Sequence, residues 1–442
     1  MTRPLAGPLI RPLSARPPLT GPAAEPLAET KPPRAAILPL AGSLLAGLLV
    51  AGPLAAGLLV AVAGPSASDD VGSAARAGQW QLAALRLPEA WRLSRGDGVL
   101  VAVLDTGVNA RHPDLAGAVI PGPDLTGDAG EPVMWGHHGT AMASLIAGRG
   151  HSTPPTGGPA RNGSADSGVI GVAPAARVLS VRVTLENGDP LREKQHPGGR
   201  DALARGIRYA VDHGADVISM SLGGGSGVWE GSAAEEEAVQ YAISHGAVLV
   251  ASSGNDGDTT NRKNFPAAYP GVIAVGAVDR RLAVAPFSNR QDYLSVVAPG
   301  TGIVTADGAD SYVVGDGTSS AAAMVAGIAA LIKSAHPELS PYHVRTAIEL
   351  GTRRRPADGY SRASGHGVAN ALLALRAADR LASPAPTPAA AGVGPDGYFG
   401  DGPAARPAPL SRLPVVLGMV LLTAVMSGRV LVRHRWRGRG VT

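Results

Sequence analysis

The chain has 442 residues, of which 45% are hydrophobic and 17% charged, and its formal net charge is +4 at pH 7. This balance excludes a mainly disordered chain, and the length suffices for one large domain of about 250 residues with appendages. Because the chain contains no cysteine, disulfides, thiolate zinc sites, iron–sulfur clusters and a cysteine nucleophile are excluded. Arginine supplies most of the positive charge without clustering on one face, so we expect no nucleic-acid partner.

The N-terminal part of the chain has the features of an export signal. Residues 1–34 are rich in proline and carry scattered basic residues without any helical or strand period, which indicates a disordered basic leader. The uncharged apolar segment Ala35–Ala63 exceeds the roughly 20 residues that cross a bilayer. It ends in an Ala-Val-Ala pattern that suits signal-peptide cleavage, while its length also fits an uncleaved signal-anchor. Both interpretations stay open, and a short extension, residues 64–88, follows.

Residues 89–381 alternate short apolar segments, rich in β-branched residues, with longer segments of helical period. Continuous apolar character predicts strands buried on both faces, as in a parallel sheet covered by helices. We therefore expect one α/β domain of three layers with a mostly parallel central sheet, and a site outside the carboxyl ends of its strands. The predicted strands are Val99–Leu104, Val178–Val183, Val217–Ser221, Val248–Ser252 and Val272–Val278, and the predicted helices include Asp201–His213, Ala233–His245 and Ser319–Ala335.

The C-terminal part predicts a membrane anchor. A Pro/Ala/Gly-rich linker, residues 382–411, leads to a predicted transmembrane helix at 412–432. Its segment Leu413–Gly428 is apolar and uncharged, and counted through Val432 it is long enough to span a bilayer, with Arg429 near the end. The tail, residues 433–442, is basic, and basic residues beside a span mark the cytoplasmic side. We expect a protein of the cell membrane that is single-pass after signal cleavage, with the central domain outside the cytoplasm.

Four polar residues stand where predicted strands end or helices begin. Asp105 follows the first strand, and His138 precedes a segment of small residues with helical period. Asn255 follows the fourth predicted strand, and Ser319 opens the most apolar helix. Taken singly, each is more often a turn residue, a solvated histidine or a helix N-cap. His137 is the adjacent alternative to His138, and the Gly-Thr that follows favours His138.

Together these residues supply the parts of serine acyl transfer. A serine hydroxyl is a weak nucleophile until a neighbouring histidine takes its proton, and that histidine needs a carboxylate to hold its tautomer. The tetrahedral oxyanion needs hydrogen-bond donors, here the Asn255 side chain and the Ser319 backbone N–H at the start of a helix. We therefore predict a triad of Asp105, His138 and Ser319.

Eight ordered blocks between about Val99 and Asn370 resemble the subtilisin-like serine proteases. They are VAVLDTGVNARHPDL, HHGTAMASLIAG, GVAPAARVLSVRV, DVISMSLGGG, VLVASSGNDG, FPAAYPGVIAVGAV, VAPG and GTSSAAAMVAGIAALI. The resemblance implies an orienting acid, a general base, a nucleophile and an oxyanion-hole amide, matched in order by Asp105, His138, Ser319 and Asn255. It also implies that the substrate backbone pairs with a strand segment, matched by Ser221, Leu222 and Gly223.

Within this family the chain is most similar to the mycosins, the membrane-anchored proteases of actinobacterial type VII secretion. The segment QWQLAALRLPEAW and the order of signal, domain, linker and anchor carry that similarity. It implies a membrane-anchored extracytoplasmic serine endopeptidase with polypeptide substrates, no required cofactor, and a type VII secretion membrane complex as partner. The alternative is a structural or assembly subunit of such a complex in which catalysis is weak or dispensable.

The chain departs from the family pattern in three places. Ala323 stands where the family usually has proline, so we expect a slightly less rigid first turn of the helix without loss of activity. Residues 64–88 are too short for the folded inhibitory propeptide of many subtilisins. A Gly/Pro/Ser-rich insertion, His151–Gly168, predicts a long loop after the histidine helix.

Calcium is the one metal for which the sequence offers a candidate site. Many subtilisins bind calcium, and Asp124, Asp128 and Glu131 are close in sequence. Their spacing matches no defined calcium loop, and a solvated acidic loop is the alternative. The mechanism itself requires no metal.

Overall fold

The computed structural model describes residues 67–127, 135–151, 167–189, 201–223, 231–308 and 311–383. The expected signal segment, linker, C-terminal span and basic tail lie outside these residues, as does most of the Gly/Pro/Ser-rich insertion. Within the described part, helix α7 (Thr318–Ala335) is the one helix long and apolar enough to cross a membrane. Most of α7 is buried inside the fold, so its apolar surface belongs to the core.

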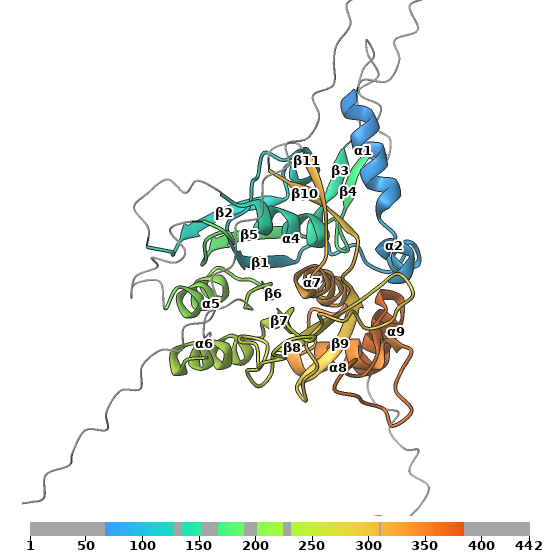
Figure 1. The fold of residues 1–442 in the computed structure, drawn as a ribbon. Coiled ribbons are helices and arrows are strands. Elements are labelled where there is room, and N and C mark those ends of the chain that lie inside the picture. Colours follow the sequence, from blue (N-terminus) through green and yellow to red (C-terminus); the bar gives the residue numbers. More distant parts are fainter. Residues whose placement is uncertain are drawn as a thin grey trace, which may run out of the picture. The chain divides into compact units, whose positions relative to one another are not determined.

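A nine-stranded sheet forms the centre of the fold, in the order β12-β13-β9-β8-β7-β6-β1-β5-β2 (Figure 1). Every neighbouring pair is parallel except the short β12–β13 pair, which confirms the predicted mostly parallel sheet. The strands are β1 (Leu100–Asp105), β2 (Val119–Asp124), β5 (Arg177–Arg182), β6 (Val217–Met220), β7 (Val248–Ser252), β8 (Ile273–Val278), β9 (Leu294–Pro299), β12 (Thr352–Arg353) and β13 (Val368–Ala369).

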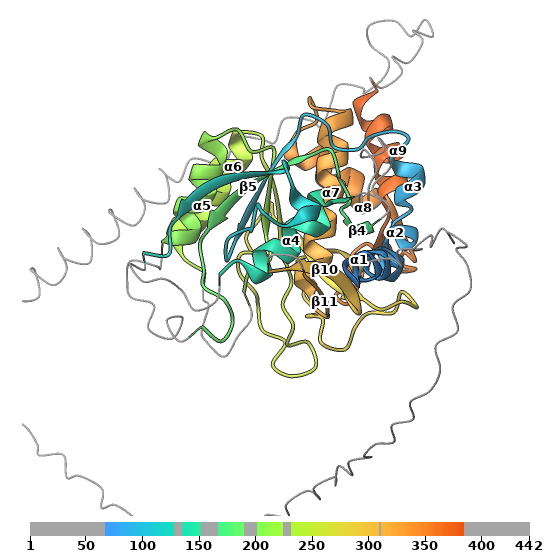
Figure 2. The same ribbon diagram turned by 90° about the horizontal axis from the view of Figure 1, so that it is seen from above.

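Helices cover both faces of the sheet, which gives the three expected layers (Figure 2). Side chains alternate along β1, so Val101 and Val103 pack into the core with α4 and α7. Ala102 and Leu104 point the other way, into the core with α5 and α6. The helices are α4 (His137–Ala147), α5 (Ala202–Asp212), α6 (Ala233–Ser244), α7, α8 (Pro341–Leu350) and α9 (Ala371–Ala382).

The described part of the N-terminal extension braces two small hairpins (Figure 1). The guanidinium of Arg76 donates to the backbone oxygens of Ser167 and Gly168, and Gln79 exchanges two hydrogen bonds of 3.0 Å with the backbone of Ile170. The described part of the extension does not line the large pocket described below. The elements concerned are α1 (Ala67–Gly78), α2 (Gln81–Ala84), α3 (Leu87–Ala90), the hairpin of β3 (Arg149–His151) with β4 (Ser167–Ile170), and the hairpin of β10 (Ile303–Asp307) with β11 (Ser311–Gly315).

Candidate active site

A pocket of about 1240 Å³ opens at the carboxyl ends of β1, β6 and β7. The start of α4, the start of α7 and the β10–β11 hairpin complete its walls. This is where a parallel sheet is expected to place its chemistry. All of the site residues predicted from the sequence line this one pocket, namely Asp105, His138, Ser221, Leu222, Gly223, Asn255 and Ser319.

Asp105 and His138 are in direct contact. Asp105 is the last residue of β1 and is fully buried, and its Oδ1 lies 2.7 Å from His138 Nδ1. The same oxygen accepts the backbone N–H of Thr106 at 2.7 Å. Oδ2 is buried and has no hydrogen-bond partner among the described residues, so the carboxylate charge is directed at the imidazole. Such a contact favours the tautomer with a proton on Nδ1, which leaves Nε2 able to accept one.

A close approach of α4 to the end of β1 makes this contact geometrically feasible. A Cβ on Gly139, the residue after His138, would lie 2.0 Å from the backbone oxygen of Gly107. Only glycine therefore fits there, as the small residues around His138 suggested. His137 points elsewhere, because its Nδ1 lies 2.6 Å from Oδ1 of Asp307 on β10. The structure thus brings His138, and not His137, to Asp105.

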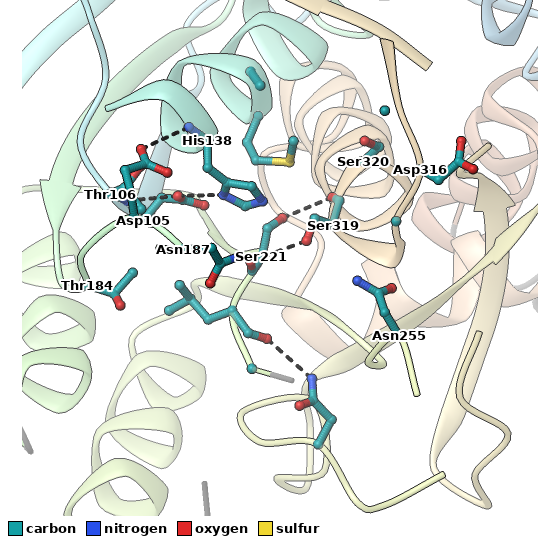
Figure 3. Close-up of a pocket in the computed structure, with 18 of the residues that line it drawn as sticks. Asp105, Thr106, His138, Thr184, Asn187, Ser221, Asn255, Asp316, Ser319 and Ser320 are labelled. Atoms are coloured by element: carbon teal, nitrogen blue, oxygen red, sulfur yellow. Dashed lines mark hydrogen bonds and ion pairs between the residues drawn. The ribbon is translucent and has the colours of Figure 1, made fainter. Parts of the chain in front are cut away.

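Ser319 is the second residue of α7, where first-turn backbone N–H groups lack helical partners. The N-cap is Gly317 without a side-chain cap, so Ser319 is not an ordinary N-cap serine. Its Oγ donates to the carbonyl oxygen of Ser221 at 3.4 Å, while Ser221 Oγ donates to the carbonyl of Ser319 at 3.0 Å. In Figure 3 the His138 ring lies between Asp105 and Ser319.

Asn255 is held in one orientation by Thr318. Its Oδ1 accepts both the backbone N–H and the Oγ1 hydroxyl of Thr318, each at 2.8 Å. The amide nitrogen Nδ2 is therefore the atom left to donate into the pocket. Together with the Ser319 backbone N–H, it offers two donors near the Ser319 hydroxyl, which is the arrangement that an oxyanion requires.

The segment Ser221–Gly223 continues from β6 along the pocket. The Leu222 carbonyl accepts Ser252 Oγ at 3.0 Å and Asn264 Nδ2 at 3.3 Å, so it is directed into the fold. The Ser221 carbonyl instead faces the pocket, because it accepts the Ser319 hydroxyl there at 3.4 Å. Gly223 also lines the pocket, and its φ of +95° takes it out of extended backbone.

Two buried pocket residues were not predicted from the sequence. Asn264 also donates to the Ser252 carbonyl at 2.7 Å and so ties two strand ends together at the pocket floor. Glu186 accepts the backbone N–H of His138 through Oε1 at 3.1 Å. It follows β5, which pairs with β1, so the rule of strand carboxyl ends could have identified it.

The expectation that Ala323 lies in the first turn of the Ser319 helix was wrong. Because α7 begins at Thr318, Ala323 lies in the second turn and not in the first. It is fully buried and the helix continues through it to Ala335. An alanine there retains a backbone N–H for the helix, which proline would lack.

Asp124, the first residue of the calcium candidate, is already paired. Its Oδ2 lies 2.7 Å from Arg182 Nη1, and its Oδ1 accepts the backbone N–H and the hydroxyl of Thr126. Partial burial would raise the pKa of Asp124, but the Thr126 hydrogen bonds and the Arg182 charge outweigh it and hold the pKa below its usual value. Asp128 and Glu131 lie outside the described residues, and no group of three or more His, Asp or Glu suited to a metal occurs within them.

Comparison with known proteins assigns the family. The model of the subtilase family (Peptidase_S8) matches residues 96–367. Thermitase of Thermoactinomyces vulgaris is 37% identical over 265 residues, covering 60% of this chain and 85% of its own. The major intracellular serine protease of Bacillus subtilis is 37% identical over 315 residues, covering 68% of this chain and 89% of its own.

Solved structures agree with this assignment. MycP1 from Mycobacterium smegmatis superposes with a TM-score of 0.54 and 30% identity, covering 67% of this chain and 84% of that one. A MycP1 described as an essential component of the type VII (ESX-1) secretion system gives a TM-score of 0.55 and 32% identity, covering 67% and 88%. The chain therefore belongs to the subtilase family and is a subtilisin-like serine endopeptidase.

Proposed function

We propose that Asp105, His138 and Ser319 are the catalytic triad of this protease and that Asn255 supplies an oxyanion-hole donor. The observation that carries the proposal is the 2.7 Å contact of Asp105 Oδ1 with His138 Nδ1, in a pocket that Ser319 lines from the start of α7. The chain order Asp, His, Ser is also that of subtilisin-type proteases.

Acylation begins with an extended peptide paired to Ser221 and Gly223. His138 Nε2 takes the hydroxyl proton as Ser319 Oγ attacks the scissile carbonyl carbon. The imidazole becomes positive at this step, and the buried carboxylate of Asp105 stabilises that charge. The new oxyanion accepts hydrogen bonds from Asn255 Nδ2 and the Ser319 backbone N–H.

The acyl-enzyme forms when the tetrahedral intermediate collapses. His138 gives its proton to the leaving amine, and the C–N bond breaks while Ser319 keeps the acyl group. Water then repeats the sequence, with His138 as base and the same donors on the second oxyanion. The carboxylic acid product leaves and the serine hydroxyl is restored.

The test of the triad is labelling with a serine-directed fluorophosphonate probe. Ser319→Ala should abolish labelling and peptide hydrolysis together. Ser320→Ala is the matched control, because Ser320 is the buried neighbour of Ser319 in the same helix turn and also lines the pocket. The Ser320→Ala protein should be labelled at the wild-type rate. Labelling of the Ser319→Ala protein at the wild-type rate would rule out Ser319 as nucleophile.

We further propose that this protease is anchored in the cell membrane, faces outward, and belongs to a type VII secretion complex. The similarity to MycP1, which is described as a component of such a system, supports the proposal. The apolar segments Ala35–Ala63 and 412–432 and the basic tail support it from the sequence, although they lie outside the described residues. N-terminal sequencing of the protein from membranes tests whether the first segment is removed.

A structural or assembly role in such a complex is the second candidate, since a complex can depend on the folded body of an essential component. Complementation of a deletion strain separates the two. If the Ser319→Ala protein restores secretion, the complex needs the body of the protein. If it fails although its abundance and membrane fraction are those of the wild type, the complex needs the hydrolysis.

A further inference from the structure

Glu186 is a buried carboxylate that the triad chemistry leaves unexplained. Its side chain lines the pocket and the residue is only 5% exposed. Its Oε1 accepts the backbone N–H of His138 at 3.1 Å. A glutamate is seldom so buried unless its charge is compensated. The start of α4 compensates it here, because the first turn of a helix presents unbonded N–H groups and the positive end of the helix dipole.

Glu186 and Asp105 both bind His138. Asp105 ends β1 and contacts the ring of His138, while Glu186 follows the adjacent strand β5 and contacts its backbone. A ring held only at Nδ1 can still swing with the end of its helix. Held also through the backbone, it is fixed at both ends, and proton transfer is sensitive to displacements of about 1 Å.

We propose that Glu186 is a positioning residue for His138, acting through the backbone hydrogen bond and through a second negative charge beside the imidazole. The inference rests on the proposed function, because it needs His138 to be the general base. The negative charge of Glu186 stabilises the His138 imidazole when the ring becomes positive during proton transfer. His137 on α4 and Asp307 on β10 also line the pocket and bond to each other. The remaining charged side chains of its described lining are Asp105, Asp256, Arg262, Lys263 and Asp316.

Two substitutions in the full-length protein separate the two contributions. Glu186→Leu removes the acceptor and the charge, and should lower kcat about tenfold with KM unchanged. Glu186→Gln keeps an acceptor oxygen of the same reach and should restore kcat to within about twofold of the wild type. Because the glutamine lacks charge, the acid limb of the fluorophosphonate labelling rate should move to lower pH by about half a unit.

The matched control is a buried cap elsewhere in the fold. Asn370 is buried and caps α9 by accepting the backbone N–H of Leu373 at 3.0 Å. Asn370→Ala should lower Tm and leave kcat, KM and the pH profile of the folded protein unchanged. If the Glu186 variants behave in the same way, Glu186 is a structural cap and the proposal is wrong.

Three other outcomes also decide the matter. A rise in KM confined to peptides with basic side chains would mean that Glu186 contacts substrate, which overturns the positioning role. Wild-type protein that neither labels nor cleaves peptides would overturn the proposed function and this inference with it. Wild-type protein that labels, together with Glu186 variants of unchanged kcat and pH profile, overturns this inference alone.

Discussion

Replacing Asn255 by leucine removes one proposed oxyanion donor while keeping nearly the same side-chain shape. In subtilisin, loss of the corresponding donor costs about 2.7–4 kcal/mol in the transition state, which is a fall of roughly 100- to 1000-fold in kcat. We expect the same range here, because Thr318 directs Asn255 Oδ1 away from the pocket and leaves Nδ2 as the donor. KM should change little, since the ground-state carbonyl depends less on that donor than the oxyanion does.

The same substitution has a limited effect on stability. Leucine loses the two hydrogen bonds that Asn255 accepts from Thr318, each worth about 1 kcal/mol. Asn255 is exposed, so water replaces part of that loss. The free energy of unfolding should therefore fall by no more than about 2 kcal/mol.

The assay is the hydrolysis of a chromogenic peptide, with kcat referred to active sites and Tm measured in parallel. Gln240→Leu removes an exposed amide from α6, outside the pocket, and should keep the wild-type kcat. If Asn255→Leu lowers kcat less than about threefold, or lowers it only as far as Tm predicts, Asn255 is not an oxyanion donor.

Two further substitutions test the geometry of the site, and a third tests the acid dependence of stability. Asp105→Asn should lower kcat by about 10⁴, the loss seen when a triad histidine is held in the wrong tautomer, and a fall below tenfold would contradict the orienting role. Gly139→Ala places a Cβ 2.0 Å from a backbone oxygen of the loop after β1, so both Tm and kcat should fall; Gly315→Ala, whose Cβ meets nothing within 4 Å, should leave Tm unchanged. Partial burial would raise the pKa of Asp256, but hydrogen bonds led by that from Thr260 hold the pKa below its usual value. Asp256 therefore stabilises the fold above about pH 4 and loses this effect as the pH falls through its folded pKa, so Asp256→Asn should flatten the acid decline of Tm; parallel curves would refute this.

The strands predicted from the sequence are those buried on both faces. β7, apart from its terminal Ser252, and β8 are apolar and fully buried, and such segments can be recognised without knowing their neighbours. β2 was missed because it is an edge strand, only half-buried, and contains Pro121 and Gly122. β9 was also missed, although it is buried along its length.

Some residues of the candidate site could be predicted from the sequence and others could not. Asp105, His138 and Ser319 could be predicted because each stands in a local motif at the end of a strand or the start of a helix. Glu186 also follows a strand, so its place near the site could have been predicted, but its role and that of Asn264 depend on contacts with residues 48 and 42 positions away, which no local pattern encodes. Their function appears only when the sheet brings those segments together.

The proposed triad takes its members from β1, α4 and α7, and the sheet strands β2, β5, β6, β7, β8 and β9 lie between β1 and α7 along the chain. Pairings between such distant segments form late, because loop closure must precede them. A polypeptide that has not completed its sheet therefore lacks the geometry of the proposed triad. If molecules of this protease cleave one another, the proposed triad makes that cleavage one-sided, because only completely folded molecules can cut.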